Sequence, residues 1–512
     1  MKLRNVGNLV LAAALTVSLL TGCGGGKDSG DGAKEGQTQG NVSDNYDAEG
    51  NWTGETYHII MTLITSGSDP VDMQKVQDAV NELSVKKAGV EVEFKPVSVF
   101  DAPSQVPMWI GAGEQIDLMA CAFTGISPYI DMNMLEPIEN LLSDYAPGIK
   151  ALEAEGTAVF DSTSTEHTYG VLVPGSFDGA GGGYMFPVNV LEEAGYSYKN
   201  WDKITLDELG EIFAKIKESH PDSYMGVLGN LPAAGNTMMV DALGATTASG
   251  VLIGTDSTKV VNYFETEEYL DYLRHVRSWY EKGYILKDAA TSDAVLSDNI
   301  KNGTFIGNFT NGDFSLLDLT GQDTGKEWIA LMFHEPYMAS ISPAAATYWT
   351  VPVTAAEPEA AVRFLDLMVT DSEIANLLLW GIEGDHYTLS EEGAYVKTEN
   401  TVNWNIPGLH ASQKVAIGNG AGKKEMDEKW SKTARENMTK GYGFCYNASS
   451  MTNQLTAVEA VITEYQAALE TGSADLDKVY PEFISKLKQN GIEEIIADKQ
   501  AQFDAWLAEQ GE

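Results

Sequence analysis

The sequence predicts an α/β protein with two lobes and a helical C-terminal region. Short apolar runs alternate with stretches of helical periodicity along most of the chain, which is typical of parallel βαβ units. The chain has 512 residues, which is more than one hydrophobic core normally supports. A hydrophobic fraction of 43% and ten tryptophans indicate a folded globular body.

The first βαβ unit is expected from Tyr57 onwards. Residues 58–64 form an apolar run with the length of a buried strand. Apolar residues then recur at helical spacing over 73–83, and residues 90–94 alternate as a second strand. The run 116–120 is expected to form the next strand. This order predicts a parallel sheet in the first lobe.

Helical patterns dominate the rest of the chain. Thr205 is expected to open a helix, because Glu208 stands three residues later, where a capping-box partner belongs. Another helix is expected over about 266–282. From about Gln454 onwards the sequence predicts a mainly helical extension, with helices over 458–468, 480–488 and 491–507.

The N-terminus has the pattern of a lipoprotein signal. Lys2 and Arg4 precede an apolar run from Leu9 to Leu20, which is shorter than the roughly 20 residues that a membrane-spanning helix needs. Leucine, threonine and glycine then precede Cys23, an order that is similar to the bacterial lipobox. The resemblance implies a signal peptide over 1–22 and a lipid on Cys23. An ordinary signal peptide or a buried helix is the alternative.

Residues 24–53 are expected to form a flexible tether. Glycines stand there among aspartate, serine, glutamine and asparagine, with almost nothing apolar before Tyr46. Such a segment cannot bury enough surface to fold. Its position after Cys23 predicts that it holds the globular body away from the lipid surface.

The formal net charge of −41 argues against several kinds of partner. Nucleic acid, polyanions and anionic lipid head groups all attract clustered lysine and arginine. The excess acid is interpreted as a solvated surface that keeps a secreted protein soluble. Cys121 and Cys445 remain after Cys23, and the sequence leaves open whether they pair.

No motif in the sequence indicates catalysis. His334-Glu335 lacks the second histidine of a zinc helix, and the nucleotide loops and the serine-nucleophile motif are absent. The pair of carboxylates that hydrolyses glycosides leaves no sequence signature among 74 acidic residues. We therefore predict no enzyme, no cofactor and no metal. A cell-surface polysaccharide hydrolase or lyase is the alternative.

Aromatic residues beside polar loops indicate sugar binding. Phe177, Trp349 and Trp404 stand next to stretches rich in glycine, asparagine, threonine and proline. An exposed ring stacks on the apolar face of a sugar, while aspartate and asparagine bond to its hydroxyls. The alternative for each ring is core packing, which is commoner. Trp380 is assigned to the core because three leucines precede it.

Several segments together carry a family pattern. The segments are GAGEQIDLM at 111–119, ITLDELGEIFAKIKESHPD at 204–222, VRSWYEKGYILKDAAT at 276–291, IKNGTFIGNF at 300–309, residues 357–387 and residues 480–507. Their order and spacing resemble the extracellular solute-binding proteins of bacterial ABC importers, the large sugar-binding type. The LipO/LplA-like lipoproteins are the subgroup that they resemble most. In one departure, Phe186-Pro187-Val188-Asn189 lacks the cation that many relatives carry there.

The resemblance implies a two-lobed periplasmic-binding-protein-like fold with crossover hinge strands. Lobe 1 would comprise 54–174 plus about 343–385, and lobe 2 would comprise 175–342 plus about 386–512. The implied function is the lipid-anchored substrate-binding component of an ABC importer on the extracytoplasmic face of the cell membrane. It would capture an oligosaccharide or related neutral glycan between the lobes, deliver it to permease subunits, and act as a monomer.

The loops that follow strands are the candidate binding site, because ligands of such sheets bind outside the carboxyl ends of the strands. Glu383, Asp385 and His386 are expected to stabilise the hinge. The predicted ligand-binding residues are Ser68, Asp69, Phe123, Thr124, Phe177, Asp178, Asn311, Asp313, Tyr348, Trp349, Trp404 and Asn405.

Overall fold

The computed structural model describes residues 45–510, apart from 123–125, 155–158, 161–166, 174–178, 246–247, 313, 341–346 and 419–422. The predicted signal segment, Cys23 and most of the predicted tether therefore lie outside the described residues. In the described part of the chain, every helix is too short or too polar to cross a membrane.

The first lobe combines strands and helices from two distant parts of the chain. In chain order they are β1 (Tyr57–Thr65), α1 (Met73–Ala88), β2 (Val90–Ser98), α2 (Ala102–Gly111), β3 (Met119–Cys121), α3 (Ser127–Asp131), α4 (Glu139–Tyr145), α5 (Pro147–Ala154), β4 (Val159–Phe160), β5 (Gly170–Leu172), β12 (Tyr348–Thr350), α11 (Pro358–Thr370), α12 (Ser372–Trp380), β13 (Tyr387–Leu389), β14 (Tyr395–Lys397) and the 3-10 helix η4 (Thr401–Trp404).

The predicted βαβ unit is confirmed. β1 and β2 pair in parallel over their whole length, and α1 connects them. The helix ends at Gly89, which takes a left-handed conformation with φ 64° that glycine adopts without a steric penalty. A parallel bridge between Met61 and Leu118 brings the third strand beside β1. The carboxyl ends of these three strands therefore share one edge.

The chain returns to the first lobe through β12. This strand lies inside a sheet of order β3-β12-β5-β4 and pairs antiparallel with both of its neighbours. Because both of its edges are hydrogen-bonded, its residues are held in the middle of the sheet. All three of them are buried.

The second lobe contains its own sheet and most of the long helices. In chain order its elements are β6 (Gly183–Pro187), α6 (Val188–Glu193), α7 (Leu206–Ser219), β7 (Tyr224–Gly226), η2 (Ala234–Thr237), β8 (Val240–Asp241), β9 (Leu252–Ile253), η3 (Tyr263–Glu265), α8 (Glu267–Glu281), α9 (Leu296–Lys301), β10 (Phe305–Thr310), α10 (Phe314–Thr324), β11 (Trp328–Met332), α13 (Lys423–Glu436), η5 (Ser449–Met451), α14 (Thr452–Glu470), α15 (Leu476–Gln489) and α16 (Ile492–Gln510).

The sheet of the second lobe has the order β11-β6-β10-β7. β6 runs antiparallel to β10 and β11, whereas β10 and β7 are parallel. The carboxyl ends of β7, β10 and β11 therefore lie at the edge where β6 begins, at Gly183.

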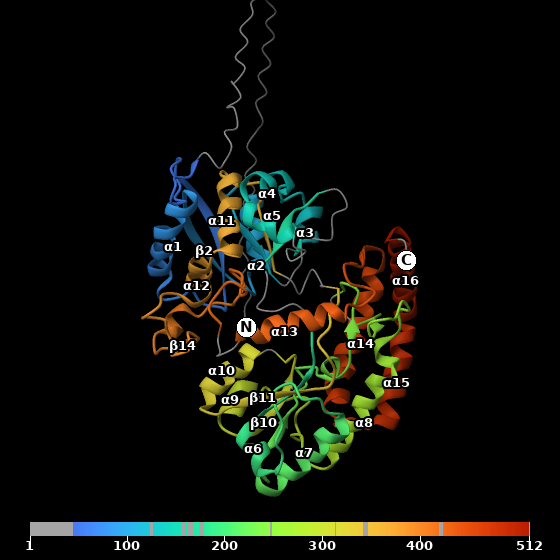
Figure 1. The fold of residues 1–512 in the computed structure, drawn as a ribbon. Helices are drawn as coiled ribbons and strands as arrows, with labels where there is room; N and C mark the ends of the chain where they lie inside the picture. The colour runs from blue at the N-terminus through green and yellow to red at the C-terminus, as the bar shows by residue number, and fades with distance from the viewer. Residues whose placement is uncertain are drawn as a thin grey trace, which may run out of the picture. The chain divides into compact units, whose positions relative to one another are not determined.

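The predicted helical elements of this lobe are confirmed. Thr205 and Glu208 form the capping box of α7, with the Glu208 amide donating to the Thr205 hydroxyl at 3.2 Å. The three C-terminal helices are each a few residues longer than predicted. Figure 1 shows α14, α15 and α16 grouped beside α8, and both α14 and α15 contact α8.

The two lobes have separate hydrophobic cores. The first core takes its buried residues from 59–171 and 348–411, and the second takes them from 184–331 and 444–503. Cys121 lies in the first core, whereas Cys445 stands beside Gly244 in the second lobe.

The predicted lobe boundary near residue 385 is wrong. The segment 387–417 packs with the first core, although it was expected in lobe 2. The ring of Trp380 lies 4.7 Å from the ring of Tyr395, and its indole N–H donates to the Ile417 carbonyl at 3.1 Å. The change to the second lobe therefore comes after Ile417 and before Trp430, which is buried against the second sheet.

The predicted tether also extends too far. Residues 45–53 fold onto the first lobe, because Trp52 packs over the buried Arg363 guanidinium at 4.6 Å and its amide donates to the Lys86 carbonyl at 2.8 Å. The rings of Tyr46 and Trp52 meet edge-on at 5.3 Å. These residues belong to the same compact unit as the rest of the first lobe, a unit that starts at Asn45.

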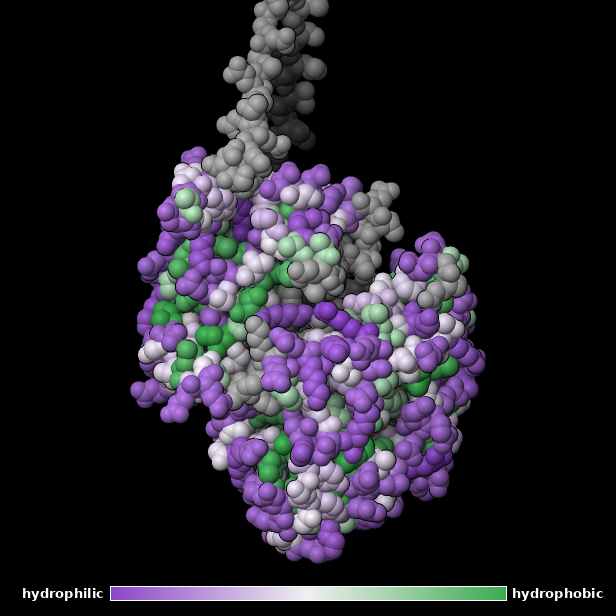
Figure 2. Space-filling model, viewed as in Figure 1, coloured by the Kyte–Doolittle hydropathy of each residue, from purple (hydrophilic) through white to green (hydrophobic). Residues whose placement is uncertain are grey.

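Hydrophilic residues cover most of the molecular face shown in Figure 2. This distribution agrees with the interpretation of the acidic excess as a solvated surface. Hydrophobic residues on that face stand in small groups between the hydrophilic ones.

Candidate functional site

The edge formed by the carboxyl ends of β1, β2 and β3 is the first part of the candidate site. β1 and β2 end together, with Thr65 opposite Ser98, and the Val99 amide donates to the Thr65 carbonyl at 2.9 Å. The loop after β1 carries Ser68 and Asp69, and both are exposed. These two predicted residues therefore present a hydroxyl and a carboxylate to solvent at the expected edge.

The sequence-based prediction missed Phe100 at the same edge. Phe100 stands two residues after the end of β2 and is 82% exposed. Its amide donates to the Ser98 hydroxyl at 3.2 Å, which holds the backbone at the strand end. An exposed ring beside polar groups can stack on a sugar. The signal was available, because Phe100 stands two residues after an alternating strand, in a loop of the kind that was searched for site residues.

Five predicted site residues lie outside the described residues and stay predictions. They follow or precede strands whose ends are described: β3, β6 and β10. The five are Phe123, Thr124, Phe177, Asp178 and Asp313.

The ligand-binding role predicted for Tyr348 and the stacking role predicted for Trp349 are contradicted by their burial. Trp349 is 0% exposed and its indole N–H donates to the Leu409 carbonyl at 2.9 Å. Tyr348 is also buried. Both lie on β12, which is paired on each side, so their rings form part of the first core and offer no face to a sugar.

The sugar-stacking role predicted for Trp404 is also contradicted by its burial. Its side chain is buried in the first core, with its ring 6.2 Å from the ring of Phe94. Asn405 follows it and is exposed. Of this predicted pair, Asn405 alone offers a polar group to a ligand.

The second part of the candidate site is the edge at which β7, β10 and β11 end. Asn311 follows β10 there and is exposed, as predicted. The backbone next to it is tightly packed, because the Trp201 indole donates to the Gly312 carbonyl at 3.2 Å. The Trp201 ring lies 5.1 Å from the ring of Trp430. A Cβ on Gly181 would come within 2.4 Å of the Trp430 ring, which explains the glycine there.

His334 is a further residue of this edge whose role was missed. It follows β11, and its Nδ1 donates to the Glu335 carbonyl at 2.9 Å, which leaves Nε2 without a proton. Nε2 is buried and has no hydrogen-bond partner among the described residues. Burial also lowers the pKa of His334, which favours the neutral ring. The sequence analysis considered His334 only in a zinc motif, which it rejected, whereas the structure gives its Nε2 the form of a hydrogen-bond acceptor.

Comparisons with known proteins agree with this geometry. Over 491 residues the chain is 22% identical to a carbohydrate ABC transporter substrate-binding protein of Streptococcus pneumoniae, covering 88% of this chain and 91% of the relative. The crystal structure of the N-glycan transport solute binding protein NgtS of the same organism superposes with a TM-score of 0.74 at 19% identity, over 88% of this chain and 99% of that chain. The chain has the fold of the ABC-transporter solute-binding proteins. The predicted family resemblance and the two-lobed α/β fold are confirmed.

Two further matches refine the comparison. NgtS in complex with Man5GlcNAc superposes on this solute-binding fold with a TM-score of 0.64, at the same identity and coverage. Residues 440–508 match a domain of unknown function, DUF3502. This range contains α14, α15 and all but the last two residues of α16, the helical extension that the sequence predicted.

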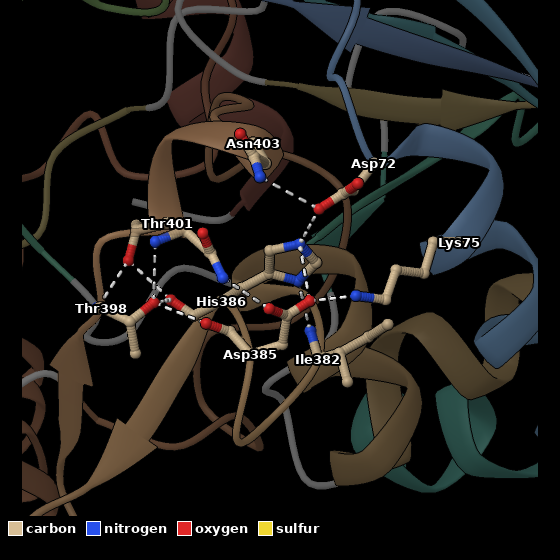
Figure 3. A network of polar contacts seen from close by, with 9 residues as sticks. Asp72, Lys75, Ile382, Asp385, His386, Thr398, Thr401 and Asn403 are labelled. Atoms are coloured by element: carbon tan, nitrogen blue, oxygen red, sulfur yellow. Dashed lines mark hydrogen bonds and ion pairs between the residues drawn. The ribbon is translucent and has the colours of Figure 1, made fainter.

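A network of polar side chains in the solute-binding fold links α1 to the segment after α12 (Figure 3). His386 is fully buried, and its Nε2 lies 3.0 Å from Asp72 Oδ2. Asp385 forms an ion pair with Lys75 and accepts a hydrogen bond from the Asn400 amide at 2.8 Å. The network connects the start of α1 with residues that the sequence places more than 300 positions later.

The network has the donor types of a metal site but does not suit a cation. The Ile382 amide donates to His386 Nδ1 at 2.9 Å, so the ring proton must sit on Nε2, which faces Asp72. A protonated Nε2 has no lone pair for a metal. The Lys75 ammonium already compensates the Asp385 charge. The hydrogen bonds are instead those of a structural clamp within the first lobe, so Asp385 and His386 do not take the hinge position that was expected for them.

Proposed function

We propose that the protein is the substrate-binding component of an ABC importer and captures an oligosaccharide or related neutral glycan between its two lobes. The observation that carries this proposal is the similarity over 88% of the chain to NgtS, which has been solved with Man1GlcNAc and with Man5GlcNAc. A named carbohydrate ABC transporter relative supports the same transporter type. Delivery to a permease follows from that role.

The two strand edges supply suitable chemistry for a neutral glycan. Phe100 offers a ring for an apolar sugar face, and Ser68 and Asp69 offer groups that bond to hydroxyls. On the second lobe, the exposed Asn311 side chain provides a further polar group. The acidic side chain at the first edge disfavours an acidic sugar.

The names of the relatives support binding without catalysis, because both are called binding proteins. Calorimetry of the purified protein against Man5GlcNAc, a fructo-oligosaccharide and an alginate oligosaccharide tests the proposal. We expect saturable binding of a neutral glycan and recovery of that glycan unchanged. Absence of binding to every glycan would overturn the substrate class, and release of shortened glycans would favour the hydrolase alternative.

We further propose that Cys23 carries a lipid, which anchors a monomeric body on the extracytoplasmic face of the cell membrane. The support is the sequence pattern before Cys23. Metabolic labelling with a palmitate analogue should label the full chain. Cys23→Ser should lose the label, whereas the control Cys445→Ser should keep it. A labelled Cys23→Ser protein would contradict the anchor.

A further inference from the structure

The loop that follows β7 lies at the ligand edge of the second lobe. β7 ends at Gly226, at the edge where β10 and β11 also end, and the loop leads from there to η2. η2 lies at the same edge, because a Cβ on Gly182 would clash with the Asn236 carbonyl oxygen and would lie 2.8 Å from His334 Nε2. Both ends of this loop are therefore at the edge that forms the second part of the candidate site.

The tip of the loop is exposed and carries the two kinds of group that bind neutral sugars. Asn230 is exposed, and Leu231 beside it is 45% exposed. An amide side chain both donates to and accepts from hydroxyls. An aliphatic side chain can cover the apolar C–H face of a sugar ring and remove that area from water. The tip therefore offers solvent-accessible polar and apolar contacts next to each other.

Local contacts hold the tip in one conformation. The Leu231 amide donates to the Leu228 carbonyl at 3.0 Å, which closes a turn, and the Gly229 amide donates to the Ala289 carbonyl at 2.9 Å. Pro232 follows the turn, and its ring fixes the backbone φ angle there. A loop that is already ordered loses less conformational entropy when it binds a ligand.

Glu470, the last residue of α14, holds the end of the loop. It is 3% exposed, and its Oε2 accepts hydrogen bonds from the Ala233 and Ala234 amides at 3.0 and 3.2 Å. The Gln466 amide and the Tyr269 hydroxyl donate to its Oε1 at 2.8 and 3.3 Å. A buried carboxylate is costly unless such hydrogen bonds compensate it. The two loop amides are therefore part of what keeps this carboxylate in place, and the carboxylate in turn fixes the loop.

The C-terminal region also holds the chain that follows η2. Lys499 of α16 donates to the Ala242 carbonyl at 3.2 Å, and the Tyr446 amide donates to the Leu243 carbonyl at 2.9 Å. These two residues and Glu470 all lie within 440–508, the range that matches the domain of unknown function. The stretch 233–243 is thus fixed at both of its ends by this region.

We propose that the C-terminal region positions the loop after β7 as a further wall of the glycan site, on which Asn230 and Leu231 contact the sugar. Glu470 is the positioning residue, because it acts on the ligand only through the loop backbone. The proposal rests on the proposed capture of a glycan. It adds a role for the matched domain, which is to set the shape of the binding surface on the second lobe.

Calorimetry on tip variants tests the wall. The probe is whichever of Man5GlcNAc, the fructo-oligosaccharide and the alginate oligosaccharide binds to the unchanged protein. Asn230→Ala and Leu231→Ala should each weaken its binding about tenfold. The matched control is Asn189→Ala, because Asn189 is exposed on α6, at the opposite edge of the same sheet, and its loss should leave the affinity unchanged.

The outcomes separate this wall from the proposed function. If none of the three glycans binds to the unchanged protein, the proposed function fails and the wall fails with it. If a glycan binds to the unchanged protein and equally well to both tip variants, the wall alone is overturned. Both tip side chains are exposed, so these variants remain informative even if a change at Glu470 prevents folding.

Hydrogen exchange tests the positioning role of Glu470. Glu470→Leu should speed the exchange of a peptide over 229–240 and weaken glycan binding about tenfold. Glu470→Gln keeps an acceptor oxygen and should recover most of both properties. Tyr480→Phe is the control for a general loss of stability, because it removes a hydrogen bond of 3.0 Å from α15 to the Phe264 carbonyl, outside the loop. Unchanged exchange in Glu470→Leu, or an equal loss of affinity in Tyr480→Phe, would overturn the positioning role.

Discussion

Asp323 Oδ1 lies 2.9 Å from Lys397 Nζ, and this ion pair joins α10 of the second lobe to β14, which packs with the first core. The neighbouring Gln322 reinforces the link, because its amide donates to the Tyr395 carbonyl at 3.3 Å. Two adjacent residues at the end of α10 thus carry contacts between parts of the chain that have separate cores.

Asp323→Ala should weaken this link slightly. Both side chains of the pair are about one-third exposed, and such pairs contribute roughly 0–1 kcal/mol. Glycan affinity should therefore change by about fivefold at most. The charge-swapped double variant Asp323→Lys with Lys397→Asp should recover part of the change. If calorimetry showed that Asp323→Ala loses much more glycan affinity than this, the pair would be shown to control lobe closure.

Phe100→Ala and Trp349→Ala should have opposite effects. Phe100 is exposed at a strand edge, so its removal should weaken glycan binding and leave the free energy of unfolding within about 0.5 kcal/mol. Trp349 is in the core, so its removal should cost about 3–5 kcal/mol of stability. Urea unfolding and calorimetry on both variants separate the two effects. Unchanged affinity in Phe100→Ala would remove that residue from the site.

His410 should make the protein less stable in acid. Burial lowers the pKa of His410 to about 4, and its Nε2 accepts a hydrogen bond from the Ile64 amide at 3.0 Å. The unfolded chain takes up this proton at about pH 6.5. The stabilisation is therefore present above that value and is lost as the pH falls towards 4, up to about 3 kcal/mol.

Unfolding by urea at pH 7 and pH 5 measures this dependence. His410→Gln should flatten the slope between these values, whereas the partly exposed control His58→Gln should leave it unchanged. An identical slope in His410→Gln would mean that other groups cause the acid sensitivity.

Lys499 should secure the C-terminal region to the rest of the second lobe. It is 1% exposed and donates to the Ala242 and Gly250 carbonyls at 3.2 and 2.8 Å. Burial lowers the pKa of Lys499 to about 8, so stability should rise between pH 8 and about pH 10.4, where the unfolded chain loses the proton.

Lys499→Ala should cost about 2–4 kcal/mol at neutral pH, because it leaves a cavity and removes the hydrogen bonds to the Ala242 and Gly250 carbonyls. Lys499→Met should cost less and should remove the alkaline rise in stability. The exposed lysine Lys478 provides a control as Lys478→Met. A persistent alkaline rise in Lys499→Met would assign it to another group.

Trp52→Ala should destabilise the first lobe by about 1–3 kcal/mol, since it removes the indole from the buried Arg363 guanidinium. Gly89→Ala should act similarly, because its Cβ would lie 2.1 Å from Trp52 Nε1 at a positive φ. Thermal unfolding of both variants, with the exposed Val71→Ala as control, checks this contact. Full stability of Trp52→Ala would mean that residues 45–53 do not brace the lobe.

Local patterns predicted the fold well because strand alternation, helical stripes and the Thr205 capping box depend on nearby residues. The aromatic residues whose environment was predicted wrongly are packed against partners that are distant in the sequence. Trp349 is buried because β12 enters between β3 and β5, which come from much earlier in the chain. Trp52 is ordered by Arg363 on α11. Composition around a tryptophan does not contain that information, so its burial could not be predicted from its neighbours.

Because residues 45–53 pack on the first lobe, a tether to the membrane would be attached to that lobe. With the lipid proposed on Cys23, residues 24–44 separate the lipid from the described body, and chain geometry limits this separation to at most about 70 Å. The tether ends at Trp52 and Arg363, on one lobe only. Pull from the membrane would therefore act on the first lobe and would reach the second lobe only through contacts such as the Asp323–Lys397 ion pair.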